Sequence, residues 1–230
     1  MIHVRTQKSH LCDSSELRDY PSNLSEKHEA SRFLTQPTID VNVLDIGSGN
    51  ENTDNGGLPM ITLVEPCEKY LQSYTEAYDE YRQNGIQTYA FCDARAYNIF
   101  EKFDDYRHER NLKPNRVGSD YYWLVDEDRN YFIGEISIRH RLNDDLKRYG
   151  GHIGYGIRFS EWNKGYGTMM LRLALEKAKF LGVNTVLITC DDDNHGSAKV
   201  MEKNGFVLLD KIMNVVNGCA ITTRRYSKQI

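Results

Sequence analysis

The pattern of apolar and polar residues divides the chain near residue 58. Before this point the sequence is rich in Ser, Asn, Asp, Glu and Gly, with short apolar islands at 32–34 and 41–44. Such a composition buries too little apolar surface to offset the entropy lost on ordering the chain. We therefore expect residues 1–58 to form a polar extension, flexible or loosely docked, and residues 59–230 to form one folded domain.

From Met60 onward the pattern is regular. Apolar residues three or four apart predict helices, and short apolar or alternating runs between turn residues predict strands. The predicted helix at 164–181 joins the strands at 152–158 and 185–190 into a βαβ unit, so the fold class is α/β (α+β). The expected elements are a strand at 61–64, helices at 68–84 and 98–109, a hairpin of 121–125 and 131–139, a strand at 152–158, a helix at 164–181, a strand at 185–190, a helix at 196–203 and a hairpin of 206–213 and 219–226.

The turn at 163–168 joins an apolar strand to a helix and is the strongest chemical signal. The first N–H groups of a helix have no internal acceptor, and the helix dipole makes this end positive, so such turns bind phosphate. Gly165 and Gly167 let the backbone approach a pyrophosphate closely, and Lys164 can add a charge. A glycine pair also begins many ordinary helices, so the surrounding sequence has to decide.

The surrounding sequence, from 121 to 206, resembles the GNAT family of acyl-CoA N-acyltransferases in two blocks. The first is Asn163-Lys164-Gly165-Tyr166-Gly167, although Trp162 stands where the family has Arg or Gln. The second comprises 194–197 and 203–206, after the strand at 185–190. The sequences of 138–143, 151–155 and 189–194 are also similar to those of a bacterial subgroup of predicted acetyltransferases.

The resemblance implies a central mixed, mostly antiparallel sheet flanked by helices, with acetyl-CoA as co-substrate and no metal. The pantetheine would run along the strand at 153–158 and the pyrophosphate would lie at the turn. Asn194 matches a family residue that contacts the cofactor, and a helix N-cap is the alternative. The cofactor-binding residues expected on this basis are Ile157, Arg158, Asn163, Lys164, Gly165, Tyr166, Gly167, Thr168, Asn194 and Ser197.

A primary amine arrives mostly as an ammonium, so a base or a water chain must remove a proton. Glu135 is our first candidate, acting through water, with an inward salt bridge as the alternative. His140 and His152, on neighbouring strands, could bracket the acceptor, and a hydrogen-bonded structural histidine is the alternative for each of them. Many relatives carry a tyrosine, as proton donor to the leaving thiolate, where this chain has Met201. Tyr155 or a water could donate this proton instead.

The composition excludes other classes. The formal net charge is -4, so neither nucleic acid nor an anionic membrane is an expected partner. The five cysteines are scattered without metal spacing, and we find neither a signal peptide nor a membrane span, which indicates a soluble cytoplasmic protein. A homodimer is left open.

The expected function is transfer of acetyl from acetyl-CoA to a primary amine of a small molecule or peptide, by direct attack in a ternary complex. The first alternative is a non-catalytic acyl-CoA sensor of the same fold, because of Met201 and Trp162. The second is a methyltransferase, because 43–50 resembles the first loop of that fold. However, the turn-rich stretch 51–57 that follows has no helical pattern.

Overall fold

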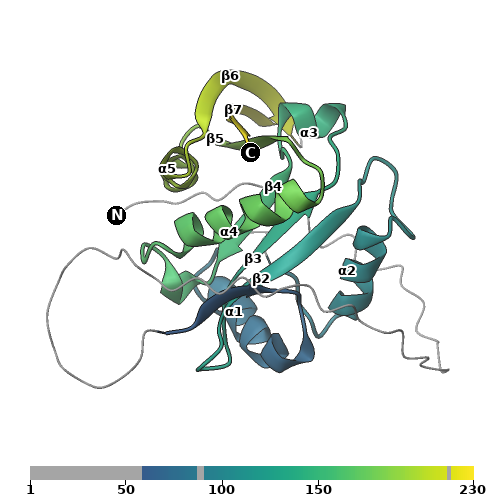
Figure 1. Cartoon of the computed structure of the whole chain (residues 1–230), viewed down its shortest axis with the longest axis vertical. Coiled ribbons are helices and arrows are strands. Elements are labelled where there is room, and N and C mark those ends of the chain that lie inside the picture. Colours follow the sequence, from purple (N-terminus) through teal and green to yellow (C-terminus); the bar gives the residue numbers. More distant parts are fainter. Residues whose placement is uncertain (1–58, 87–90, 217–218) are drawn as a thin grey trace, which may run out of the picture.

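The computed structural model describes residues 59–86, 91–216 and 219–230. Within them, two antiparallel sheets are flanked by helices (Figure 1). The elements in chain order are β1 (Ile61–Val64), η2 (Glu68–Tyr70), α1 (Leu71–Gln83), α2 (Ile99–Arg107), β2 (Ser119–Asp126), β3 (Tyr131–Arg139), α3 (Asp144–Arg148), β4 (Ile153–Ile157), η3 (Phe159–Glu161), α4 (Tyr166–Phe180), β5 (Thr185–Asp191), α5 (His195–Lys203), β6 (Val207–Val216) and β7 (Cys219–Gln229).

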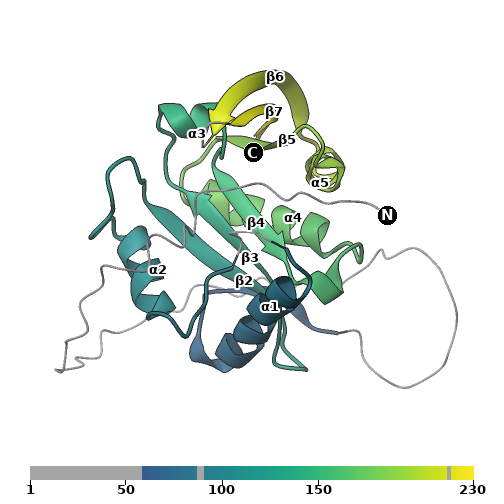
Figure 2. The same ribbon diagram turned by 180° about the vertical axis from the view of Figure 1, so that it is seen from behind.

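The first sheet has the strand order β1-β2-β3-β4 and lies between two helical layers. Figure 1 shows α4 in front of this sheet, and Figure 2 shows α1 and α2 on its other face. Alternation along β2 explains the two layers, because Tyr122 and Leu124 belong to the core that contains α4 whereas Trp123 belongs to the core that contains α1. Each face of the sheet is thus covered by its own apolar core.

The tyrosines of the first helix belong to the core on the α1 and α2 side. Tyr74 is fully buried and stacks on Trp123 of β2 with 4.7 Å between ring centroids, and it meets Phe132 edge to face at 5.0 Å. Tyr70 and Tyr81 are also buried. These tyrosines thus form core, and a large aromatic area is buried beneath β2 and β3.

A β-bulge in β3 lies one residue from Gly134. Leu124 faces Gly134 and Val125 faces Phe132, so Ile133 is the extra residue on β3. A Cβ at Gly134 would come within 2.6 Å of the Gly156 carbonyl oxygen, so this glycine permits the close approach of β4.

The second sheet has the order β5-β7-β6 and meets the first at one end of β4. There the His152 N–H donates to the Leu187 carbonyl at 2.7 Å, and the Leu187 N–H donates to His152 Nδ1 at 3.0 Å. In the described residues β4 and β5 form no further ladder, so the βαβ unit spans two sheets instead of one mixed sheet. The fold class is confirmed, and at this junction an imidazole accepts the N–H that a backbone carbonyl would accept in a continuous ladder.

Two sequence predictions lie outside the described residues: the polar extension at 1–58 and the methyltransferase-like loop at 43–50. Among the described helices, none combines the length and the apolar character that a membrane crossing requires.

Candidate active site

The outer edge of β4 is the first component of the site. Arg139 N–H donates to His152 O, and Arg158 N–H donates to Ile133 O, each at 2.7 Å. Bonded and non-bonded positions alternate along an antiparallel pair. The backbone groups of Tyr155 and Ile157 therefore point away from β3, toward the edge from which β5 diverges.

The N-terminus of α4 is the second component. Gly165 is its N-cap at φ +86°, and no side chain caps this end. The start of α5 differs, because Asn194 Oδ1 accepts a hydrogen bond from the Ser197 N–H at 3.0 Å and caps that helix. A Cβ at Gly165 would meet no atom within 4 Å, so this glycine is required by its backbone angle and not by crowding. The amides of Tyr166 and Gly167 begin the helix and are oriented to bind an anion.

Gly167 differs from Gly165 in what surrounds it. A Cβ there would lie 3.3 Å from Val200 Cγ2 of α5 and 3.8 Å from Ile157 Cγ1. The residue thus allows α4 to pack closely on α5 and β4. We expected it mainly to admit the pyrophosphate, and the structure adds this packing role.

Lys164 is exposed, and its Nζ lies 3.1 Å from the carboxylate of Glu161, which is buried and also accepts from the Tyr131 hydroxyl at 3.2 Å. The lysine is therefore partly neutralised in this structure. Of the other turn residues, Asn163 is exposed at φ +63°, and the Thr168 N–H bonds to Gly165 O at 3.0 Å.

The side chain of Arg158 does not reach the turn, and its predicted contact with the cofactor is wrong for the guanidinium. Arg158 is 5% exposed, and its Nε donates to Glu80 of α1 at 2.7 Å, while Nη1 donates to Ser73 Oγ at 2.9 Å. The acidic face of α1 draws the cation to the opposite side of the sheet from α4. Its backbone still follows the edge of β4.

Trp162, in the place of the family's Arg or Gln, binds the backbone instead of a phosphate. Its Nε1 donates to the Ile157 carbonyl at 2.7 Å, and the Tyr81 hydroxyl donates to the same oxygen. These two bonds fix the end of β4 next to the turn. No pattern in the sequence indicates this role.

Tyr155 projects from β4 on the α4 side, toward Ser197 at the start of α5. Its hydroxyl is buried without a hydrogen-bond partner in the described residues, although Ser197 lies close enough to lower its pKa. Burial is the larger effect and raises the pKa of Tyr155 well above its ordinary value. Met201, one turn after Ser197, is fully buried, so Tyr155 brings a phenol to the region where relatives use a tyrosine of this helix.

Glu135 lies on the opposite face, beneath α1 and α2, and is 6% exposed. Trp123 Nε1 donates to its Oε2 at 2.9 Å. Burial, and then the neighbouring Cys92, raise the pKa of Glu135 to about 8, against the effects of Trp123 and Lys102. The predicted alternative, an inward salt bridge, is not present among the described ion pairs.

The two histidines do not bracket Glu135. His140 Nε2 lies 2.7 Å from Asp120 Oδ2, and Arg107 Nε donates to the other oxygen of this carboxylate at 2.7 Å. His152 holds the junction with Leu187, and burial lowers its pKa. Both rings thus bind structural partners at the far end of the sheet, and their place beside the acceptor stays a prediction.

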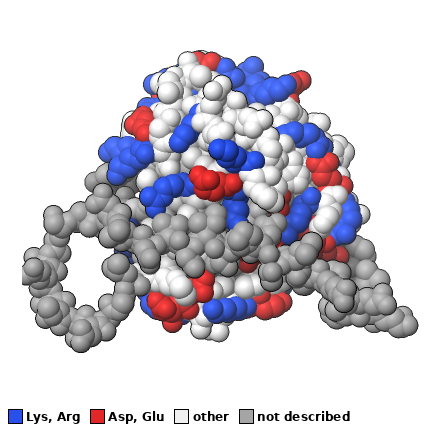
Figure 3. Space-filling view, viewed as in Figure 1, with Lys and Arg blue, Asp and Glu red and all other residues white. Residues whose placement is uncertain are grey.

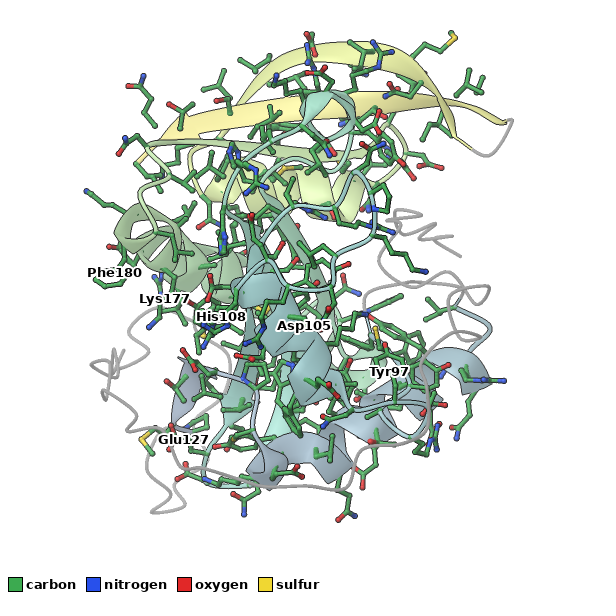
Figure 4. The ribbon with its side chains drawn as sticks, turned by 90° about the vertical axis from the view of Figure 1, so that its right-hand side faces the viewer. Tyr97, Asp105, His108, Glu127, Lys177 and Phe180 are labelled. Carbon is green, nitrogen blue, oxygen red and sulfur yellow. The ribbon has the colours of Figure 1, made fainter. Side chains whose placement is uncertain are left out.

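Several residues near Glu135 were not found from the sequence. Lys102 Nζ lies 3.2 Å from Cys92 Sγ and 3.3 Å from the Tyr97 hydroxyl. Figure 4 shows Tyr97 and Asp105 with α2, whereas Lys177 and Phe180 belong to α4 on the other side. The lysine at 102 follows Asn98 in the first turns of a predicted helix, but its partners come from other segments.

The acidic run at 191–193 lines a hollow of about 530 Å³ between the end of β5 and β7. Asp192 is neutralised there by Lys211 at 2.7 Å and Arg224 at 2.6 Å. Figure 3 shows basic and acidic side chains mixed over the described surface in that view. We assign no chemistry to this run, since the charge of its central residue, Asp192, is balanced within the fold.

Comparison with known proteins identifies this arrangement. The family model for the acetyltransferase (GNAT) domain matches residues 62–207, so the chain belongs to the GNAT acetyltransferase family. A search of curated proteins finds no significant match.

Solved structures share the fold. The chain is similar to the microcin C7 self-immunity acetyltransferase MccE in complex with acetyl-CoA and AMP, with TM-score 0.55 and 22% identity over 74% of this chain and 92% of that one. It is also similar to a ribosomal-protein-S5-alanine acetyltransferase from Vibrio fischeri, with TM-score 0.57 and 17% identity over 76% and 95%. The protein is thus an acetyltransferase of this family, and the predicted class is confirmed.

Proposed function

We propose that the protein transfers acetyl from acetyl-CoA to a primary amine of a small molecule or peptide, by direct attack in a ternary complex. One observation carries the proposal. Beyond the His152–Leu187 contact no ladder joins β4 to β5, so the outward amides of Tyr155 and Ile157 lie on an unpaired strand edge that leads toward the uncapped N-terminus of α4.

The unpaired edge of β4 and the start of α4 suit the parts of the cofactor. Outward amides of β4 can bind pantetheine, and one of them can stabilise the charge that develops on the thioester oxygen during attack. The turn at 163–168 and the positive end of α4 suit the pyrophosphate. The hydrogen bonds of Trp162 and Tyr81 to Ile157 O keep the two parts in register.

Glu135 is the proposed base, acting through water from the α1 and α2 face. It accepts the ammonium proton, the neutral amine nitrogen then bonds to the thioester carbon, and the carbon–sulfur bond breaks. The departing thiolate takes a proton from Tyr155, and the second proton that the attacking nitrogen releases as the amide forms returns to this phenolate through water. Because the pKa of Glu135 is about 8, the reaction should be fastest above neutral pH.

Direct transfer is favoured over an acyl-cysteine intermediate. Cys190, near the Tyr155 hydroxyl, is fully buried, and burial raises the pKa of its thiol to about 12. A thiol this weakly acidic is not a nucleophile near neutral pH. The amine must then attack the bound thioester itself.

The test is release of free CoA when the full chain and acetyl-CoA are incubated with a mixed panel of primary amines. Mass spectrometry should find one added acetyl group on at least one amine, and omission of the amines should abolish release. If acetyl-CoA binds but no amine is acetylated and no CoA appears, the non-catalytic sensor is the better description.

A further inference from the structure

Two arginines are buried under the first sheet, and only one has a carboxylate. Arg158 is neutralised by Glu80. Arg139 is 7% exposed, and its Nη1 donates to the carbonyls of Gly150 and Gly151 at 3.0 and 2.9 Å. Among the described residues, no acidic group pairs with Arg139, and no acceptor binds its Nε or Nη2. Burial lowers the pKa of Arg139, as expected for a cation that lacks a counter-ion.

A second unsatisfied group lies beside this cation. Tyr121 is 4% exposed, and its hydroxyl has no hydrogen-bond partner in the described residues. Tyr121 faces Ser137 across the strand pair, two residues before Arg139, so both side chains share the α1 and α2 face of the sheet. Phe103 stacks on the tyrosine ring at 4.4 Å and fixes its direction.

We propose that Arg139 and Tyr121 form a subsite for a carboxylate carried by the amine acceptor, which rests on the function proposed above. The guanidinium offers N–H groups in a fork that matches a carboxylate, and the phenol adds a third donor. An anion bound there would supply the charge and the acceptor that both buried groups lack.

The position of Glu135 sets the length of this acceptor. Glu135 and Arg139 are four residues apart on the same face of β3, which separates their Cα atoms by roughly 13 Å. The bonds to Gly150 and Gly151 hold the guanidinium on the side away from Glu135. An α-amino acid, with one carbon between its amine and carboxylate, is too short, whereas an ω-amino acid or a short peptide spans the distance.

The test compares amines that differ only in the carboxylate. The first pair is 6-aminohexanoate and hexylamine, and the second is triglycine and its C-terminal amide, which separates small-molecule from peptide acceptors. With acetyl-CoA and the full chain, we expect kcat/KM for at least one carboxylate to exceed that of its neutral partner by about tenfold or more. Equal values in both pairs would overturn the subsite while leaving acetyl transfer intact.

Substitutions at two residues locate the effect. Arg139→Met should raise KM for the acceptor with a carboxylate and leave KM for its neutral partner unchanged. Arg139→Lys should raise KM for the carboxylate acceptor by a smaller factor. Since Arg139 also holds two carbonyls, Tyr121→Phe is the matched variant that removes only an unpartnered hydroxyl. Its thermal unfolding should equal that of the wild type, with a smaller rise in the same KM. If the preference survives in both Arg139→Met and Tyr121→Phe, the assignment is wrong.

A binding measurement makes the subsite independent of turnover. Calorimetry of the CoA-saturated protein should show tighter binding of the carboxylate than of its neutral partner in at least one pair, and Arg139→Met should remove the difference. If the difference is found without acetyl transfer, the subsite stands and the proposed function fails. Equal binding in both pairs overturns the subsite whatever the activity.

Discussion

The carboxyl group of Glu135 and the indole of Trp123 are joined by a 2.9 Å hydrogen bond between opposed residues of β3 and β2. Trp123 is fully buried between Tyr74 and Phe103, so its Nε1 has a fixed direction. The bond holds the carboxyl group still within an apolar layer. A proton acceptor is thereby positioned at the face where we place the amine.

The first prediction concerns rate against pH. A base must be deprotonated to act, so turnover should rise as pH increases through about 8, the pKa of Glu135. Glu135→Gln should lose roughly 100-fold or more in kcat and lose this acidic limb, with acetyl-CoA affinity nearly unchanged. Glu176→Gln, an exposed change on α4, is the control. Wild-type turnover in Glu135→Gln from pH 6 to 9 would contradict the role of base.

The second prediction concerns stability. Glu135 has a pKa near 4.5 when unfolded and about 8 when folded, so between these values the folded state binds the extra proton. Stability should fall as pH rises through this window and level off above it. The glutamine of Glu135→Gln cannot titrate. The free energy of unfolding of this variant, relative to that of the wild type, should therefore increase from pH 4.5 to 8, by at most roughly 5 kcal/mol. Urea unfolding at several pH values measures it, and a pH-independent difference would show that the carboxyl is not buried.

The regular elements follow from local periodicity, because one face of each helix and strand is buried. Tyr74 and Ala77 lie against the sheet as their spacing predicts, and Gly182, at φ +81°, follows the end of α4. The division of the sheet could not be foreseen. It depends on the contact of His152 with Leu187, which are 35 residues apart.

The site shows the same distinction. The uncapped N-terminus of α4 is determined by a local turn that contains glycines, so the position of this helix end could be predicted. The direction of a long side chain depends on partners that are distant in sequence, as for Arg158 and Glu80, which are 78 residues apart. For the same reason Trp123, Lys102 and Arg139 could not be recognised as site residues from local pattern.

The third prediction concerns the cofactor turn. Gly167→Glu should weaken acetyl-CoA binding because it crowds Val200 and places a negative charge at the anion-binding end of α4. Gly167→Gln has nearly the same size without the charge and should bind roughly tenfold more tightly than Gly167→Glu. Calorimetric titration of the folded variants with acetyl-CoA measures this difference. Equal affinity of the wild type, Gly167→Gln and Gly167→Glu for acetyl-CoA would refute the phosphate site.

The fourth prediction concerns the domain boundary. The first strand begins at Ile61, and the Met60 N–H donates to Asp128 Oδ2 at 3.1 Å. A chain that begins at Met60 should therefore keep cooperative unfolding and bind acetyl-CoA like the full chain. Calorimetric unfolding of both chains provides the comparison. Loss of the cooperative transition in the shorter chain would mean that residues before Met60 contribute to the fold.

The last prediction concerns the Tyr155 hydroxyl. Because this group is buried without a partner among the described residues, Tyr155→Phe should leave stability unchanged or slightly raised, so a loss of activity would be functional. If the phenol protonates the leaving thiolate, kcat should fall about tenfold or more at constant acetyl-CoA affinity. Adding Met201→Tyr, one turn from Ser197 on α5, should restore part of the rate. Unchanged kcat in a folded Tyr155→Phe variant would mean that water protonates the thiolate.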